Sequence, residues 1–142
     1  MKASFWIRGT YIFQLATGII HSMSFFVEQV PANEKEKQLL DIMNNYKMDM
    51  GSGIHRSMSE IFVSVSACLT LFCLFGGAVI LLLYRKQIAW SALRPVMLIN
   101  TIAFGIGLAV MIRFAFLPPI VCFGLIFICS LMAWITMKKQ TQ

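Results

Sequence analysis

Long apolar runs, separated by short polar segments, dominate the pattern of the chain. Four of them are continuous enough to form long helices, and they cover about 7–27, 61–84, 96–117 and 119–137. Because about 20 helical residues cross a hydrocarbon core of about 30 Å, each run is long enough to span a membrane. The last run follows Pro118, and Pro119 suits the first turn of a helix because no amide hydrogen is needed there. The pattern predicts an all-α fold, a four-helix antiparallel transmembrane bundle that forms a single domain over 1–142.

The first run differs from the others because a polar stripe passes along it. Its polar residues recur at alternating steps of four and three residues: Thr10, Gln14, Thr17, His21, Ser24 and Glu28. That spacing places all six side chains on one face of a helix. Polar groups inside a bilayer are costly unless they find partners, so we expect this polar stripe to face other helices.

The second run carries a stripe of mostly small residues at the same spacing. Its members are Arg56, Ser59, Val63, Ser66, Thr70, Cys73 and Gly77. Small side chains let two helix backbones approach closely, so this stripe is the predicted partner of the first run. For two antiparallel helices, we predict that residues whose numbers sum to about 87 lie at one depth, which pairs Gln14 with Cys73 and Thr10 with Gly77. A register shifted by one helical turn fits the spacing equally well.

The third run contributes a further polar position and a charged end. Asn100 and Gly107 share one face, which gives a small-residue contact with one amide to satisfy. Arg113 lies towards the end of this run. Since an arginine near a membrane interface prefers a counter-charge, we expect it to pair with Glu28 or Glu60 or to reach a lipid phosphate.

The polar segment between the first two runs has a helical pattern of its own. Asn33 is followed three residues later by Glu36, which is the pattern of a helix cap. Apolar residues then recur at helical spacing: Leu39, Met43, Tyr46 and Met50. We predict a short amphipathic helix over about 34–50 that lies on the membrane surface and ends at Gly51 and Gly53. It is either a lid over a pocket or, as we favour, a connector that covers its own apolar side.

Composition and charge indicate the class of protein and its orientation. The 142 residues are 58% hydrophobic and 13% charged, which is more apolar surface than a soluble domain of this size can bury. All six acidic residues lie between 28 and 60, where four basic residues leave a net charge of −2, and the rest of the chain carries +8. Basic residues flank the other ends of the spans: Lys2, Arg8, Arg85, Lys86, Arg94, Lys138 and Lys139. By the positive-inside rule, both termini then face the cytoplasm and the segment 28–60 faces outward.

The same features argue against several other classes. The net charge of +6 is spread singly or in pairs beside apolar runs, as in membrane anchors, so we expect no nucleic-acid partner. The four cysteines lie in apolar runs without a C-x-x-C pair, and we expect neither a metal nor a cofactor. The first run is too long for a cleaved signal peptide, so it should remain as a span. The expected partners are the lipid bilayer and, within it, another protein or a second copy of the chain.

Titratable groups of both signs gather near the predicted outer ends of the spans. This outer cluster comprises His21, Glu28, His55, Arg56, Glu60 and Arg113. No catalytic motif accompanies it, so we favour a non-enzymatic accessory protein, or a bundle that binds a partner or a lipid, with the cluster as a salt-bridged cap. The alternatives are a proton-linked solute transport component that uses His21, a membrane enzyme acting on a lipid or quinone at the outer leaflet, and a haem protein with His21 and His55 as ligands.

Three features of the chain together form a recognisable arrangement. They are a histidine in the first span, an acidic amphipathic loop, and the segment GIHRSMSEIF, which leads into a second span rich in small residues. In this arrangement the chain resembles small bacterial membrane proteins with four spans whose activity is not known. The resemblance covers the topology of the whole chain. It implies a bacterial inner membrane as the location, and it brings no cofactor or catalytic residue.

Overall fold

Helices make up most of the chain. The computed structural model describes residues 2–138. In chain order the elements are α1 (Ala3–Met23), the 3₁₀ turn η1 (Ser24–Phe26), α2 (Glu34–Asn45), β1 (Lys47–Asp49), β2 (His55–Ser57), α3 (Met58–Arg85), α4 (Trp90–Phe114) and α5 (Leu117–Lys138). The predicted all-α class is confirmed, with one short β-hairpin added.

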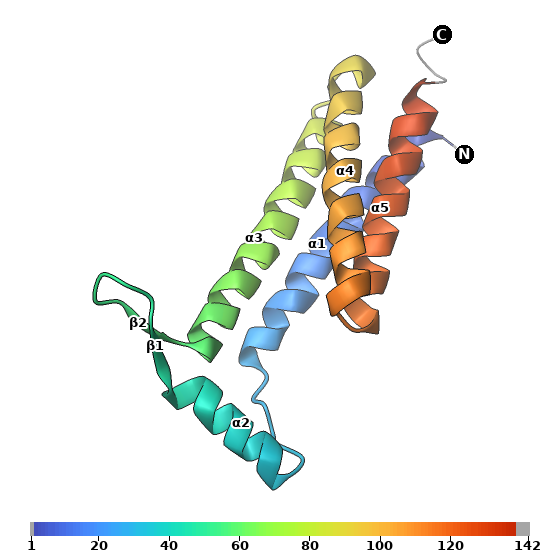
Figure 1. The fold of residues 1–142 in the computed structure, drawn as a ribbon. Helices are drawn as coiled ribbons and strands as arrows, with labels where there is room; N and C mark the ends of the chain where they lie inside the picture. The colour runs from blue at the N-terminus through green and yellow to red at the C-terminus, as the bar shows by residue number, and fades with distance from the viewer. Residues whose placement is uncertain (1, 139–142) are drawn as a thin grey trace.

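The four long helices form a bundle, and the smaller elements lie beyond one end of it. Figure 1 shows α1, α3, α4 and α5 running alongside one another, with α2, β1 and β2 at the lower left. We call this the hairpin end. The opposite end, where α1 and α4 begin and α3 and α5 finish, is the terminal end. Of the basic residues predicted at that end, Lys139 lies outside the described residues.

Three of the helices are long and apolar enough to cross a membrane. They are α3, α4 and α5, and they indicate a membrane protein. α1 has 21 residues but is not in this group, because its polar stripe makes it less apolar than the others. The three later spans are supported by the structure, and the first span stays a prediction.

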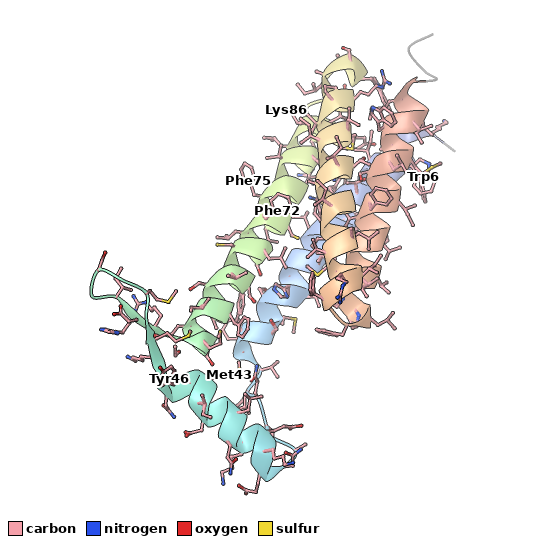
Figure 2. The ribbon with its side chains drawn as sticks, viewed as in Figure 1. Trp6, Met43, Tyr46, Phe72, Phe75 and Lys86 are labelled. Carbon is pink, nitrogen blue, oxygen red and sulfur yellow. The ribbon has the colours of Figure 1, made fainter. Side chains whose placement is uncertain are left out.

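Neighbours in the sequence are not always neighbours in the bundle. α1 packs between α3 and α5, and α4 packs against α5, whereas α3 and α4 contact each other only slightly. Two buried apolar clusters fill the interior, one around Ile80 and Met97 and the other around Cys73 and Phe104. Phe72 of α3 points towards α4 and stacks on Phe104, with 5.6 Å between the ring centroids (Figure 2). This ring pair is a bridge between two helices whose backbones stay apart.

Glycines bring α1 and α3 close together. A Cβ atom at Gly18 would lie 2.8 Å from side-chain carbons of Leu74, and one at Gly77 would lie 2.9 Å from Leu15. Neither position accepts a side chain unless its neighbour moves. The predicted meeting of these two helices through small residues is therefore confirmed. The predicted register is wrong by about one turn, because Gly77 lies against Leu15 rather than Thr10.

The polar stripe of α1 is shorter than predicted. Thr10 and Gln14 are fully buried on the inward face. However, α1 ends at Met23, so Ser24 lies in η1 and Glu28 in the extended segment that follows. The hydroxyl of Ser24 donates to a carbonyl oxygen of the last turn of α1 at 2.6 Å. The prediction that all six polar residues share one helix face is wrong for the last two, because the helix stops before it reaches them.

The helix predicted over about 34–50 begins where expected but is shorter. The side chain of Asn33 accepts a hydrogen bond from the backbone N–H of Glu36 at 2.9 Å, which confirms the predicted cap. The carboxylate of Glu36 in turn accepts from the backbone N–H of Ala32 at 2.7 Å. α2 then ends at Asn45, one turn before the predicted end.

A β-hairpin replaces the last turn of that predicted helix. β1 and β2 pair antiparallel, with Met48 opposite Arg56. Between them the backbone has positive φ at Gly51, Ser52 and Gly53, with values of 86°, 56° and 76°. Glycine adopts this conformation at little cost, so the two glycines build the hairpin turn instead of only ending a helix.

α4 starts about six residues earlier than predicted, and α5 starts within two residues of its predicted position. α4 begins at Trp90, so Arg94 lies within the helix rather than in the preceding loop. Its guanidinium lies over the ring of Trp134 of α5, 5.5 Å from the centroid. Pro118 and Pro119 lie in the first turn of α5, as their fixed φ and missing N–H favour.

Candidate functional site

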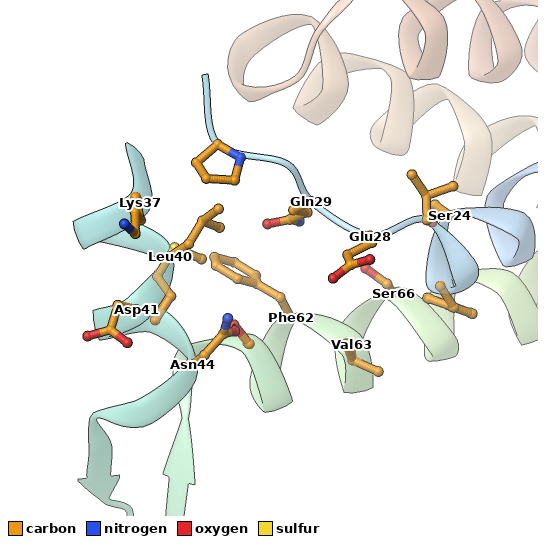
Figure 3. Close-up of a pocket in the computed structure, with 15 residues that line it drawn as sticks. Ser24, Glu28, Gln29, Lys37, Leu40, Asp41, Asn44, Phe62, Val63 and Ser66 are labelled. Carbon is orange, nitrogen blue, oxygen red and sulfur yellow. The ribbon is translucent and has the colours of Figure 1, made fainter. Parts of the chain in front are cut away.

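A pocket of about 610 Å³ opens at the hairpin end of the bundle. Three parts of the chain form its walls: the segment 24–31 after α1, the helix α2, and the first turns of α3 (Figure 3). The residues that line it are Ser24, Phe25, Val27, Glu28, Gln29, Pro31, Lys37, Leu40, Asp41, Met43, Asn44, Ser59, Phe62, Val63 and Ser66. Five of these were predicted as stripe or cluster residues: Ser24, Glu28, Ser59, Val63 and Ser66.

Local capping sets the direction of the α3 wall. The hydroxyl of Ser57 accepts from the backbone N–H of Glu60 at 3.2 Å, and the Glu60 carboxylate accepts from the backbone N–H of Ser57 at 2.8 Å. This capping box starts α3 directly after β2, so the hairpin and the helix are joined without a flexible linker. The carboxylate of Glu60 is therefore used in holding the start of a helix.

Apolar side chains from opposite walls meet in the pocket. Figure 3 shows Leu40 of α2 and Phe62 of α3 pointing towards each other. Phe62 is 54% exposed, so packing within the protein leaves part of its ring free to contact a molecule in the pocket. Phe25 and Met43 add to the same lining. A lipid-like chain or an apolar side chain would lose water against these groups.

Polar and charged side chains from all three walls complete the lining, and two of its three charged groups are acids. Glu28 and Asp41 both line the pocket, and Figure 3 shows the Glu28 carboxylate pointing towards Ser66. Lys37, the basic group of the lining, pairs with Glu34 at 3.6 Å. Because Lys37 is partly neutralised by a residue outside the lining, the pocket is left with a negative balance.

The α2 wall is held lightly. No residue of α2 is buried, and five lie along the pocket. The side chain of Asn44 accepts a short hydrogen bond from the Ser59 hydroxyl of α3, which is a direct polar tie between the two walls. A wall with so little buried surface adapts to what it contacts at small cost in packing energy.

The predicted outer cluster does not come together as one site. Of its six members, Glu28 lines the pocket, and the other five are outside the lining. His55 and Arg56 are exposed on β2, and His55 lies opposite Asp49 of β1 in the strand register. Arg113 is exposed in the last turn of α4, and its guanidinium lies 5.2 Å from the ring centroid of Phe114.

The predicted salt-bridged cap is also not found. Among residues 2–138, one ion pair is found, between Lys37 and Glu34. No ion pair there joins Arg113 to Glu28 or Glu60. Glu60 is taken up by its capping role, and Arg113 lies against an aromatic ring instead. The expected pairing of Arg113 with either carboxylate is therefore wrong.

His21 lies near the pocket but not in its lining. The ring is half-buried in the last turn of α1 and meets Phe25 edge-on, with 5.9 Å between the centroids. Its Nε2 atom is buried and has no hydrogen-bond partner among the described residues. The Oγ1 of Thr70, a buried stripe residue of α3, is likewise without a partner there. Thr17, one turn before His21 on α1, is half-buried.

A polar contact deeper in the bundle was missed by the sequence analysis. The side-chain Nε2 of Gln14 donates to Oδ1 of Asn100 on α4 at 3.1 Å. A Cβ atom at Gly76 would lie 2.7 Å from the same Nε2, so the amide fills the space that this glycine leaves. Gln14 was paired with Cys73, but its hydrogen bond goes to α4 because α3 offers it glycine backbone rather than a side chain.

Metal-binding and thiol chemistry are not indicated by the part of the chain described. Within residues 2–138, no group of three or more His, Cys, Asp or Glu side chains is placed to hold a metal ion. The four cysteines are free, with Cys68 and Cys73 on α3 and Cys122 and Cys129 on α5. The lining of the pocket offers apolar and carboxylate groups.

Comparison with known protein families, curated proteins and solved structures finds no match to the chain. No function is therefore transferred by similarity. The resemblance to small bacterial four-span proteins stays a prediction about topology, and the function is argued from the pocket and the helices alone.

Proposed function

We propose that α1 is a fourth span and that the protein is a multi-pass protein of a bacterial inner membrane. Its length of 21 residues matches the hydrocarbon core, and it lies between α3 and α5, which are themselves apolar enough to cross. Its exposed face carries Phe5, Ile12, Ile19 and Ile20, which are suited to acyl chains. The polar stripe lowers the hydropathy of α1, but its buried members Thr10 and Gln14 face inward, which is how polar groups are tolerated in spans.

The proposed orientation places the terminal end in the cytoplasm and the hairpin end outside. Lys2, Arg8, Arg85 and Lys86 gather at the terminal end, whereas all six acidic residues belong to the segment that forms the hairpin end. Basic residues near the ends of spans are retained on the cytoplasmic side. Both termini are then cytoplasmic, as the sequence predicts.

We further propose that the protein is a non-enzymatic binding module and that its outward pocket takes an amphipathic, lipid-like molecule. The single observation that carries this is the pocket under α2, where Leu40 and Phe62 line a space of about 610 Å³ together with Glu28 and Asp41. The volume falls in the range of small-molecule sites. The pocket lies where α1 and α3 leave the bundle, so an apolar chain can enter from the bilayer while its polar group stays near water.

The charge of the lining narrows the class of ligand. Glu28 and Asp41 oppose a carboxylate or phosphate head group, while Lys37 is already paired with Glu34. The pocket therefore favours a neutral or positively charged head group, such as that of a long-chain amine. The same pocket would also serve an accessory role. In that case the apolar group that enters it belongs to a protein partner instead of a lipid.

The fourth span is tested by cysteine labelling. In a variant without its four cysteines, Lys2→Cys, Ser52→Cys and Ala89→Cys are exposed in turn to a membrane-impermeant maleimide. We expect Ser52→Cys to be labelled in intact cells, because Ser52 is in the hairpin turn, and the other two only after permeabilisation. Labelling of Lys2→Cys from outside together with Ser52→Cys would show that α1 does not span.

The ligand class is tested with a fluorescent long-chain amine and the corresponding fatty acid. We expect the amine to bind more tightly, and Phe62→Ala to weaken its binding about tenfold through lost apolar contact. Phe75→Ala is the matched control, because Phe75 lies on the same helix, is 73% exposed and points away from the bundle (Figure 2). Equal binding of both probes, or equal losses in the two variants, would contradict the proposal.

A second candidate, a component of proton-linked solute transport, is favoured by one specific observation. His21 Nε2, Thr70 Oγ1 and Gln14 Oε1 are all buried without a partner among the described residues, and they follow the α1–α3 interface. Histidine within a span is a proton carrier in many transporters. His21→Gln keeps the ring volume approximately and removes the titration. Folding should be preserved, and any proton-coupled flux in proteoliposomes should be lost only if this candidate holds.

A further inference from the structure

A second pocket lies at the terminal end of the bundle and has a different chemistry. Its volume is about 580 Å³, and it lies between the start of α1, the end of α3 and the start of α4. Arg8 comes from α1, Tyr84 and Arg85 come from α3, and Gln87 comes from the connection to α4. Four polar side chains from three parts of the chain thus converge on one space.

The positive charge of this pocket is not compensated by an acid. The Nε of Arg8 donates to the hydroxyl of Tyr84 at 3.0 Å, and its guanidinium lies 5.5 Å from the centroid of that ring. Tyr84 is a neutral partner, so the bond orients Arg8 without cancelling its charge. The lining contains no carboxylate, and none of the described residues forms an ion pair with Arg8 or Arg85. Every acidic residue of the chain belongs to the segment 28–60, which forms the hairpin end.

Apolar side chains make up the rest of the lining. Ile7 and Leu93 are buried in the core of the bundle, and they form a fixed apolar floor. Ile88 and Trp90 are partly exposed beside the arginines. A tryptophan at the end of a span is typical of the layer where head groups meet acyl chains. Guanidinium groups with adjacent apolar surface match a phosphate that carries hydrocarbon chains.

We propose that this pocket binds the phosphate of an anionic phospholipid, such as phosphatidylglycerol, from the leaflet at the terminal end. Arg8 and Arg85 bind the phosphate oxygens, and Gln87 is placed to bind the hydroxyl groups of the head group. A membrane lipid is favoured over free phosphate because the arginines lie beside Ile88 and Trp90 at the end of apolar helices. Basic pockets between spans are the usual binding sites of such head groups.

The proposal is tested by native mass spectrometry of the full chain, released from nanodiscs that hold equal amounts of phosphatidylglycerol and phosphatidylcholine. We expect the protein to retain phosphatidylglycerol preferentially. Removing two cationic contacts with Arg8→Gln and Arg85→Gln should reduce that retention about 30-fold. The matched control is Lys2→Gln with Lys86→Gln, which removes the same charge from the same end without touching the lining. This control should change retention by about twofold or less.

Arg85→Gln alone keeps the test valid if the double variant does not fold. Arg8 bonds to Tyr84, whereas Arg85 is an exposed residue of the last turn of α3, so its replacement spares the packing of the bundle. Helix content by circular dichroism verifies the fold of each variant.

Three outcomes would overturn the proposal. They are equal retention of the two lipids, equal losses in the pocket variants and the lysine control, and displacement of the retained lipid by millimolar inorganic phosphate. The last outcome would assign the pocket to a free anion. None of these measurements involves the hairpin-end pocket, so failure of the amine-binding proposal leaves this one untouched.

Discussion

The two pockets of this protein have nearly equal volumes, about 610 and 580 Å³, and opposite characters. At the hairpin end, carboxylates and exposed aromatic groups line a space that is closed by a helix without buried residues. At the terminal end, arginines lie over a floor of buried core residues. The two pockets therefore differ in the charge that each offers to the ligand proposed for it, and in how much buried core fixes the shape of each lining.

The common element of the two pockets is the contact between α1 and α3. The segment after α1 and the first turns of α3 line the hairpin-end pocket, and the first turns of α1 and the end of α3 line the terminal-end pocket. A change that separates these helices should damage both pockets. A change that touches only one end should damage only one, and the predictions below use this distinction.

The largest effect is expected at the glycine contact. Gly18→Ala places a Cβ atom 2.8 Å from Leu74, and the overlap, less the gain in helix propensity, should destabilise the bundle by about 1–2 kcal/mol. Gly124→Ala is the matched control, since the nearest atom to its Cβ is 4.0 Å away, and it should be neutral or slightly stabilising. Unfolding in detergent measures both. Both ligand affinities should fall in Gly18→Ala, and equal stability of the two variants would show that the close contact does not hold the bundle.

An intermediate effect is expected from the amide pair between the two pockets. Gln14→Ala and Asn100→Ala should each destabilise the bundle, and their double-mutant cycle should give a coupling of about 0.6 kcal/mol and at most about 2. Because Trp90 and Leu93 of α4 line only the terminal-end pocket, lipid retention should fall more than amine binding. A coupling of zero would mean that the two amides stabilise the bundle independently.

The smallest effect on overall stability is expected from Asn33→Ala. It removes the cap of α2, which costs about 1 kcal/mol within that helix, but α2 has no buried residue through which the loss could spread. Hydrogen exchange of α2 amides should become about fivefold faster, with the unfolding midpoint unchanged. Gln38→Ala, at an exposed position in the middle of the same helix, is the control. A drop in the midpoint would show that α2 is part of the cooperative unit.

Local signals in the sequence predicted the fold well where one short pattern decides the structure. The cap at Asn33, the place of Pro118 and Pro119 in the first turn of α5, and the meeting of α1 with the side of α3 that carries Gly77 all follow from neighbouring residues or from helical spacing. These features depend on backbone geometry, which the residue types determine directly.

Predictions that needed the relative position of distant elements did less well. The register of α1 and α3 was off by one turn because helical spacing repeats at every turn. The hydrogen bond of Gln14 goes to Asn100, which lies 86 residues away, and no local spacing reports such a contact. The outer cluster was assembled from groups at a similar predicted depth, but depth alone does not fix position around the bundle. Glu60 also forms a capping box with Ser57, so its carboxylate is bonded at the start of α3 instead of pairing with an arginine.

The weak contact between α3 and α4 has a consequence for how the chain is made. The α1–α3 pair already contains its close glycine contact once the chain has been made as far as Arg85. α4 meets this pair mainly through side chains, such as the Gln14–Asn100 hydrogen bond and the Phe72–Phe104 ring pair, and its main neighbour is α5, which follows it in the chain. The second half of the bundle should therefore stay open during biosynthesis until α5 is released from the translocation machinery, and truncation before Leu117 should leave α4 exposed to membrane proteases.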